Sequence, residues 1–152
     1  WGTALAKLLH ESGHDVVLWG HEKRLDAIHR KGCNERYLPE VKLPRDWKLE
    51  ADHATAMESA ACAVIAVPSK NFRKRAEALT DFQGIVVSVT KGIEHISNLT
   101  MGGILSECAP IAQIAAISGP SLAIEVAKGI PTALVSASAD EAIAKVVQDV
   151  IN

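Results

Sequence analysis

The chain has 152 residues, enough to bury one sizeable core; 48% of them are apolar but only 4% aromatic. A core built mainly from Ala, Val, Ile and Leu favours helices packed on a sheet, and so the α/β class, over a β-sandwich. The net charge of −2, with scattered basic residues, argues against a nucleic-acid partner, and no apolar run approaches the roughly 20 residues of a membrane span.

The N-terminal third reads as helix, strand and helix. Apolar residues between Ala4 and Leu9 have helical spacing, and Gly13 follows where a helix commonly ends. The run 15–19 is short, apolar and β-branched, which predicts a buried strand. Leu25 and Ile28 lie among charges in 22–31, which predicts a helix with one modest apolar face.

Four later apolar runs predict strands, each bounded by helix-like sequence: "CAVIAV", "GIVVSV", "IAQIAAIS" and "TALVSA". Apolar strands that alternate with helices indicate a parallel sheet covered on both faces. A capping box from Ser138 to Glu141 predicts the start of a last helix. The fold class is therefore α/β, with a doubly wound, mainly parallel sheet in a three-layer sandwich.

Ligands of such sheets bind at the carboxyl ends of the strands, so the residues just after each apolar run are the candidate ligand contacts. They are polar, basic or glycine-rich: 20–22, 67–69, 90–92 and 118–121.

Trp1 and Gly2 precede the first helix and would be the tail of a G-x-G-x-x-G turn. Gly2 would be its third glycine, and the helix N-terminus would present free amides to a diphosphate. A plain helix start is the alternative. About twenty residues later, His21 stands where a dinucleotide fold reads the adenosine ribose. His21, with Lys23 and Arg24 beside it, favours binding of the 2′-phosphate of NADP. Glu22 could bind a free ribose hydroxyl, so NAD stays open. The alternative is that Glu22, Lys23 and Arg24 are only an exposed first helical turn, and for Lys23 this is the better interpretation.

Lys91 lies between a buried strand and Gly92, where a positive charge can hold a phosphate or polarise a carbonyl; exposed loop is the alternative. The turn Ser118 to Ser121 ends another strand at the same edge. Its hydroxyls and amides could bind an anion, or Ser118 could cap a helix that begins at Pro120.

The three cysteines form no CxxC pair, which indicates reduced thiols and a cytoplasmic location. We expect Cys62 to be a small core residue. The histidines lack metal-ligand spacing, so no metal site is predicted. The start at Trp1, without Met, and the end inside an apolar helical pattern predict a longer natural polypeptide.

With these motifs assembled, the chain resembles the N-terminal, dinucleotide-binding part of bacterial NAD(P)-dependent glycerol-3-phosphate dehydrogenase, a Rossmann-like domain. The resemblance covers nearly the whole chain, through "WGTALAKLLHESGHDVVLWG", "RYLPEVKLP", "VIAVPS", "VTKGIE" and "SGPSLAIEVAKGIPTA".

The resemblance implies roles for individual residues. The implied cofactor contacts are Trp1, Gly2, His21, Pro68, Lys91 and Ala123; the implied substrate contacts are Lys91, Gly119 and Ser121. Ser69 accompanies Pro68 near the nicotinamide ribose. The helix after Pro120 is expected to pack its turn back onto the sheet.

The resemblance also implies an activity: interconversion of dihydroxyacetone phosphate and sn-glycerol 3-phosphate with NAD(P)H, for glycerophospholipid synthesis. Residues 1–152 would be the NAD(P)-binding domain without its first strand. The proton-transferring lysine would lie in a helical C-terminal domain, so no catalytic residue is assigned here and the chain alone is expected to be inactive. A homodimer is considered. The alternatives are another 6-phosphogluconate-dehydrogenase-like NAD(P)-dependent dehydrogenase and a non-catalytic NAD(P)-sensing module.

Overall fold

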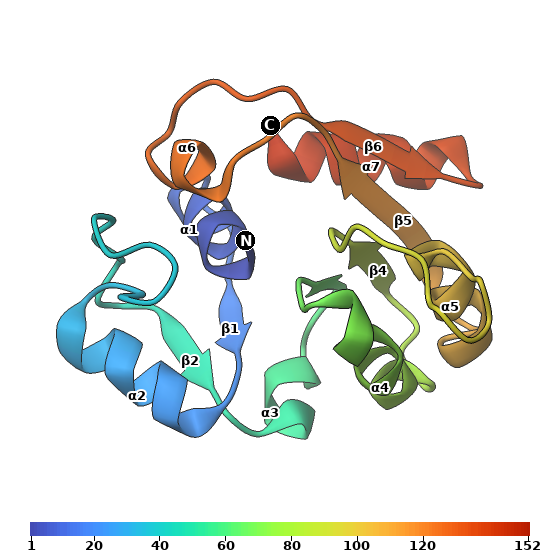
Figure 1. Cartoon of the computed structure of the whole chain (residues 1–152), viewed down its shortest axis with the longest axis horizontal. Helices are drawn as coiled ribbons and strands as arrows, with labels where there is room; N and C mark the ends of the chain where they lie inside the picture. The colour runs from blue at the N-terminus through green and yellow to red at the C-terminus, as the bar shows by residue number, and fades with distance from the viewer. The chain divides into compact units, whose positions relative to one another are not determined.

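The computed structural model describes residues 1–152, and the chain divides into two compact units (Figure 1). The first unit comprises Trp1–Ala60 and Pro120–Ala133. The second comprises Ala61–Gly119 and Leu134–Asn152. Each unit has its own sheet and its own helices, so each is described by itself.

The first unit contains a two-stranded parallel sheet. Its elements are α1 (Gly2–Glu11), β1 (Val17–Trp19), α2 (Glu22–Lys31), β2 (Lys48–Glu50), α3 (His53–Met57) and α6 (Ala123–Ala127). The predicted helix, strand and helix are α1, β1 and α2, but the expectation that the strand is buried is wrong: Val17 is exposed and the rest of β1 is only half-buried. The glycine signal at Gly13 is confirmed, since Gly13 follows α1 at positive φ; Gly32 ends α2 in the same way, without having been predicted.

Strand β2 was not predicted, because its sequence Lys-Leu-Glu is short and mostly polar. It is defined by pairing: Val17 aligns with Lys48 and Trp19 with Glu50. The indole nitrogen of Trp19 donates to the carbonyl of Ala51 at 3.0 Å, which further joins the ends of the two strands.

Helices α1 and α6 pack side by side and share the core of the first unit (Figure 1). Ala4 and Ala6 of α1 are buried with Val126 and Ala127 of α6. The small side chains of the three alanines let the two helices approach closely. The expectation that the helix after Pro120 packs back onto the sheet is therefore wrong, since α6 packs on α1.

The second unit contains a four-stranded sheet in the order β3-β4-β5-β6. The strands are β3 (Cys62–Ile65), β4 (Ile85–Ser88), β5 (Gln113–Ser118) and β6 (Val135–Ser138). The helices are α4 (Phe72–Ala76), α5 (Met101–Cys108) and α7 (Glu141–Ile151), with short 3₁₀ turns η1 (Ser69–Asn71) and η2 (Glu77–Leu79).

Strands β3, β4 and β5 are parallel, as the apolar runs predicted, whereas β6 is antiparallel to β5. The reason lies in the connection from Gly119 to Leu134. Its only helix, α6, packs on α1, so no crossover helix returns the chain to the opposite end of the sheet. The sheet is mainly parallel, but the expectation that the run "TALVSA" forms another parallel strand is wrong, because this strand, β6, is antiparallel.

Two further local predictions are corrected. The side chain that caps α7 is Asp140, whose carboxylate accepts from the amide of Ala142 at 2.9 Å, and Ser138 instead donates to the carbonyl of Ile114 at 2.6 Å. Cys62 is exposed, because residues of β3 alternate between faces: Ala63 and Ile65 point into the core and Cys62 points away from it.

Strand β4 is central in this sheet, and its Val86 and Val87 are fully buried. Helix α5 packs on β4 and β5 and contributes Ile104 and Leu105 to the core, while α7 packs on β5 and β6. Phe72 at the start of α4 is also fully buried. This packing fixes the positions at which the strands end, and with them the candidate site.

Candidate functional site

The N-terminus of α1 has the properties of an anion site. The first backbone bond of the helix runs from the amide of Leu5 to the carbonyl of Trp1 at 3.1 Å, so the amides of Gly2, Thr3 and Ala4 have no helical carbonyl to bind. The first turn carries no acidic residue, and Trp1 makes no side-chain cap. Free amides, an uncompensated helix dipole and a glycine without a Cβ fit the diphosphate of a dinucleotide.

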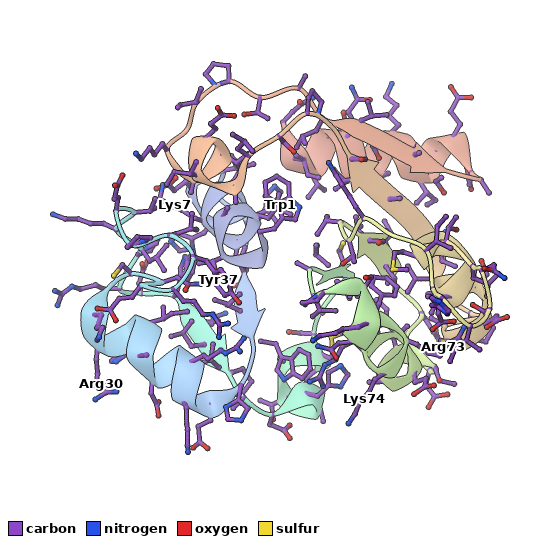
Figure 2. All side chains as sticks on the ribbon, in the orientation of Figure 1. Trp1, Lys7, Arg30, Tyr37, Arg73 and Lys74 are labelled. Carbon is purple, nitrogen blue, oxygen red and sulfur yellow. The ribbon has the colours of Figure 1, made fainter.

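A tertiary hydrogen bond fixes this first turn. The amide nitrogen of Asn34 donates to the hydroxyl of Thr3 at 2.9 Å, from the loop that follows α2. Trp1 lies at the N-terminal end of α1 (Figure 2) and packs against the core of the first unit, as does Ala123 at the start of α6. Two predicted cofactor contacts from distant parts of the sequence thus pack against one core.

His21 is the N-cap of α2, directly after β1 and Gly20. Its side chain makes no capping hydrogen bond, and 21–24 are all exposed. The reading of Glu22, Lys23 and Arg24 as an exposed first helical turn is confirmed. His21 remains free to meet a ligand at the end of β1, as a dinucleotide fold requires.

In the second unit, the ends of β3 and β4 are joined by Thr90. Its hydroxyl lies 2.8 Å from the carbonyl of Val67 and 3.3 Å from that of Ile65. Gly92 then fits against Ser69: its φ is +143°, and an added Cβ would lie 3.1 Å from the Cβ of Ser69. Close packing therefore brings together two of the predicted strand-end segments.

Lys91 connects the third strand end to the other two. Its ammonium nitrogen donates to the carbonyl of Gly119, the residue after β5, at 2.9 Å. The side chain is exposed, so the ammonium keeps donors available to a ligand. Pro68, Ser69, Lys91 and Gly119 are thus gathered at the carboxyl edge of one sheet.

Ser118 is the last residue of β5, and α6 begins only at Ala123 with Leu122 at its N-cap. Ser118 therefore does not cap that helix, and this alternative is wrong. Ser121 and Ala123 belong to the first unit. A contact of Ser121 with the substrate stays a prediction.

An ion-pair network that the sequence did not predict joins the loop that follows Lys91 to helices α4 and α5, with Arg73, labelled in Figure 2, at its centre. Arg73 of α4 binds both carboxylate oxygens of Glu94, from Nε at 2.9 and 3.0 Å and from Nη2 at 2.6 Å. Its Nη1 binds Glu107 of α5 at 2.8 Å. The hydroxyl of Ser97 donates to Glu94 as well. The motif "KGIE" contains Glu94, but its partner depends on tertiary packing and has no local signal.

This network shifts the protonation of its members. The hydrogen bonds from Arg73, and then that from Ser97, lower the pKa of Glu94 to about 2. The same carboxylates raise the pKa of Arg73. Burial raises the pKa of the Cys108 thiol, the largest effect on that group.

No group of three or more His, Cys, Asp and Glu side chains in residues 1–152 is placed to hold a metal ion. None of the helices combines the length and the apolar character needed to cross a bilayer.

Known proteins match this chain over nearly its full length. The family described as the NAD-dependent glycerol-3-phosphate dehydrogenase N-terminus matches residues 1–144. A glycerol-3-phosphate dehydrogenase [NAD(P)+] of Anaeromyxobacter dehalogenans is 42% identical over 98% of this chain and 47% of its own length. A protein of Salinibacter ruber with the name glycerol-3-phosphate dehydrogenase [NAD(P)+] 1 is 41% identical over 99% of this chain and 46% of its own length.

A solved structure agrees with the sequence relatives. The crystal structure of glycerol-3-phosphate dehydrogenase from Coxiella burnetii superposes with a TM-score of 0.90 at 33% identity, over 100% of this chain and 48% of that one. The chain spans about half the length of the curated relatives it matches. Its fold is Rossmann-like, and the chain belongs to the family of NAD-dependent glycerol-3-phosphate dehydrogenase N-terminal domains.

Proposed function

We propose that this chain is the NAD(P)-binding part of a glycerol-3-phosphate dehydrogenase that interconverts dihydroxyacetone phosphate and sn-glycerol 3-phosphate. The observation that carries the proposal is the hydrogen bond from Lys91 to Gly119, which holds a cation at the carboxyl edge of the sheet. Support for the reaction comes from the family match and from the relatives' names. NAD(P)H supplies the hydride when it is bound.

The residues of the first unit bind the cofactor in this proposal. The amides at the start of α1 hold the diphosphate, with Trp1, Gly2 and Ala123 beside it. His21 meets the adenosine ribose. Its imidazole favours the 2′-phosphate of NADP, and NAD is the alternative. The supporting facts are the uncapped N-terminus of α1 and the exposed His21 at the end of β1.

The residues of the second unit bind and orient the substrate. Lys91 stabilises negative charge on the substrate, and we also assign it a cofactor contact. Gly119 contacts the substrate, while Pro68 and Ser69 lie at the nicotinamide-ribose side; Ser121, which belongs to the first unit, is the other proposed substrate contact. The preset bond from Lys91 to Gly119 supports this role, because a cation already held in place costs little reorganisation during the reaction.

The proposal includes parts beyond residues 1–152. A strand that precedes Trp1 completes the sheet, and a helical domain that follows Asn152 supplies the proton-transferring lysine. Support comes from the relatives, of which the chain spans about half. We also propose a cytoplasmic location and a homodimeric assembly; three free cysteines agree with a reducing compartment.

The test follows the absorbance of reduced nicotinamide after dihydroxyacetone phosphate is added to the complete protein, with NADPH and NADH in parallel. Turnover with a preference for NADPH is expected. Cofactor binding without turnover would contradict the proposal and favour another dehydrogenase of the superfamily or a sensing module. The 152-residue chain, assayed beside it, is expected to be inactive.

A further inference from the structure

We propose that Arg73 and Glu94 are positioning residues for Lys91: their ion pair holds the loop that carries Lys91, and so sets where its ammonium group lies. This inference rests on the proposed function for its enzymatic readout. Its structural basis, the path from Glu94 to Lys91, lies entirely within the second unit.

The loop after Lys91 is closed on itself. Ile93 pairs with Thr100 in an antiparallel bridge, and the amide of Glu94 donates to the carbonyl of Leu99 at 2.8 Å. The amide of Asn98 donates back to the carbonyl of Glu94 at 2.9 Å, and Asn98 has a φ of 58°. These bonds brace the loop internally, with Glu94 at its base.

Two of the three apolar side chains of this loop do not fasten it to the body of the unit, whereas the half-buried Leu99 packs against Gly103 of α5. Ile93 is 65% exposed and Ile96 is 93% exposed. The part of the loop next to Lys91 therefore has no hydrophobic anchor, and polar contacts hold it in place.

Arg73 supplies such a contact. It emerges from α4 next to Phe72, which is fully buried, so the base of its side chain is rigid. Three of its hydrogen bonds reach the two oxygens of Glu94, an arrangement that fixes orientation as well as distance. The guanidinium and carboxylate are 32% and 21% exposed, so water screens this pair less than it screens the surface pairs of the chain.

The held loop has two connections to the site. Gly92, between Lys91 and the loop, packs against Ser69. Lys91 itself reaches Gly119. Without the ion pair between Arg73 and Glu94, the loop could shift away from Ser69. The backbone of Lys91 would then no longer be held at the position from which its ammonium group reaches Gly119.

The test is a double-mutant cycle in the complete protein, with kcat/KM for dihydroxyacetone phosphate as the readout. Glu94→Gln keeps the size of the side chain but removes the charge that orients Arg73. It is expected to lower kcat/KM about tenfold in the wild-type background and less than twofold in a Lys91→Met background. Equal fold-losses in both backgrounds would mean a general structural role and would overturn the inference, as would wild-type activity of Glu94→Gln.

Glu107→Gln is the matched control. It removes the other carboxylate of Arg73 but leaves the pair with Glu94 intact, and Glu107 is 54% exposed on α5. Its kcat/KM is expected to stay within twofold of wild type, and a loss as large as that of Glu94→Gln would overturn the assignment to the loop. Arg73→Lys is the second variant, which keeps the charge and loses the two-pronged geometry; it should behave as Glu94→Gln does in both backgrounds.

A labelling experiment reads the position of Lys91 without turnover. Acetic anhydride modifies free amines, and mass spectrometry compares Lys91 with Lys145 of α7 in the same sample. Modification of Lys91 relative to Lys145 should be several-fold faster in Glu94→Gln than in wild type. Equal rates would overturn the positioning role. If the wild-type protein does not reduce dihydroxyacetone phosphate, the proposed function fails, and the labelling rates alone decide this inference.

Discussion

The ammonium nitrogen of Lys91 donates a hydrogen bond of 2.9 Å to the carbonyl oxygen of Gly119, and this bond joins the end of β4 to the end of β5. A lysine at this position satisfies one of its three donors with the protein. The remaining donors, on an exposed side chain, are available to an anion or a polarised carbonyl. The bond thus orients a cation without neutralising it, since the acceptor is a neutral carbonyl.

Replacing Lys91 with Met should lower turnover of the complete protein by at least about 100-fold, because a preset charge at the reacting group contributes on that scale. The fold should persist, since the side chain is exposed and makes a single hydrogen bond. Steady-state kinetics and thermal unfolding check both points. Lys145→Met on the exposed face of α7 is the control. Near-normal turnover of Lys91→Met would show that Lys91 does not belong to the site.

Gly92→Ala should destabilise the protein by about 1–3 kcal/mol, since its φ of +143° is strained for any residue with a Cβ. The new methyl would also press on Ser69, 3.1 Å away, and displace the neighbouring Lys91. Urea unfolding and kcat/KM should therefore both change. Gly102→Ala, in the first turn of α5 with its nearest neighbour at 3.8 Å, should alter stability by no more than about 1 kcal/mol.

The elements that the sequence predicted best are those whose signals are local. Gly13 follows α1 at positive φ, as predicted, and β4 is a continuous apolar run because Val86 and Val87, which point to opposite faces of the sheet, are both buried. Strand β2 and the direction of β6 were not predictable in this way. The first is defined by its pairing with β1, and the second by where α6 packs.

The same distinction applies to the site. Lys91, Pro68 and Gly119 follow apolar runs, so their position at one sheet edge follows from the rule that parallel strands end together. Arg73 gave no such signal, because it lies in a short basic helix that reads as exposed surface. Its pairing with Glu94 and Glu107 depends on how α4 and α5 pack.

The contribution of Glu94 to stability should disappear in acid. Arg73 and Ser97 lower its pKa in the folded protein to about 2, from an ordinary value of 4.5. The unfolded chain therefore binds the proton first as the pH falls, and the stabilisation present above about pH 5 is lost between 4.5 and 2. Urea unfolding at several pH values should show the gap between wild type and Glu94→Gln closing over that range. A gap that stays constant down to pH 3 would contradict the assignment.

His21→Asp should move cofactor preference from NADPH toward NADH by about tenfold in kcat/KM, since an acid at the end of β1 repels a 2′-phosphate and binds a free ribose hydroxyl. The variant should fold, because His21 is an exposed N-cap without a capping bond and aspartate is a better N-cap. Lys23→Ala is the control from the same exposed turn, and its ratio of NADPH to NADH activity should match wild type. If Lys23→Ala changes the ratio and His21→Asp does not, the residue that reads the ribose is Lys23, and the imidazole serves only as the boundary of α2.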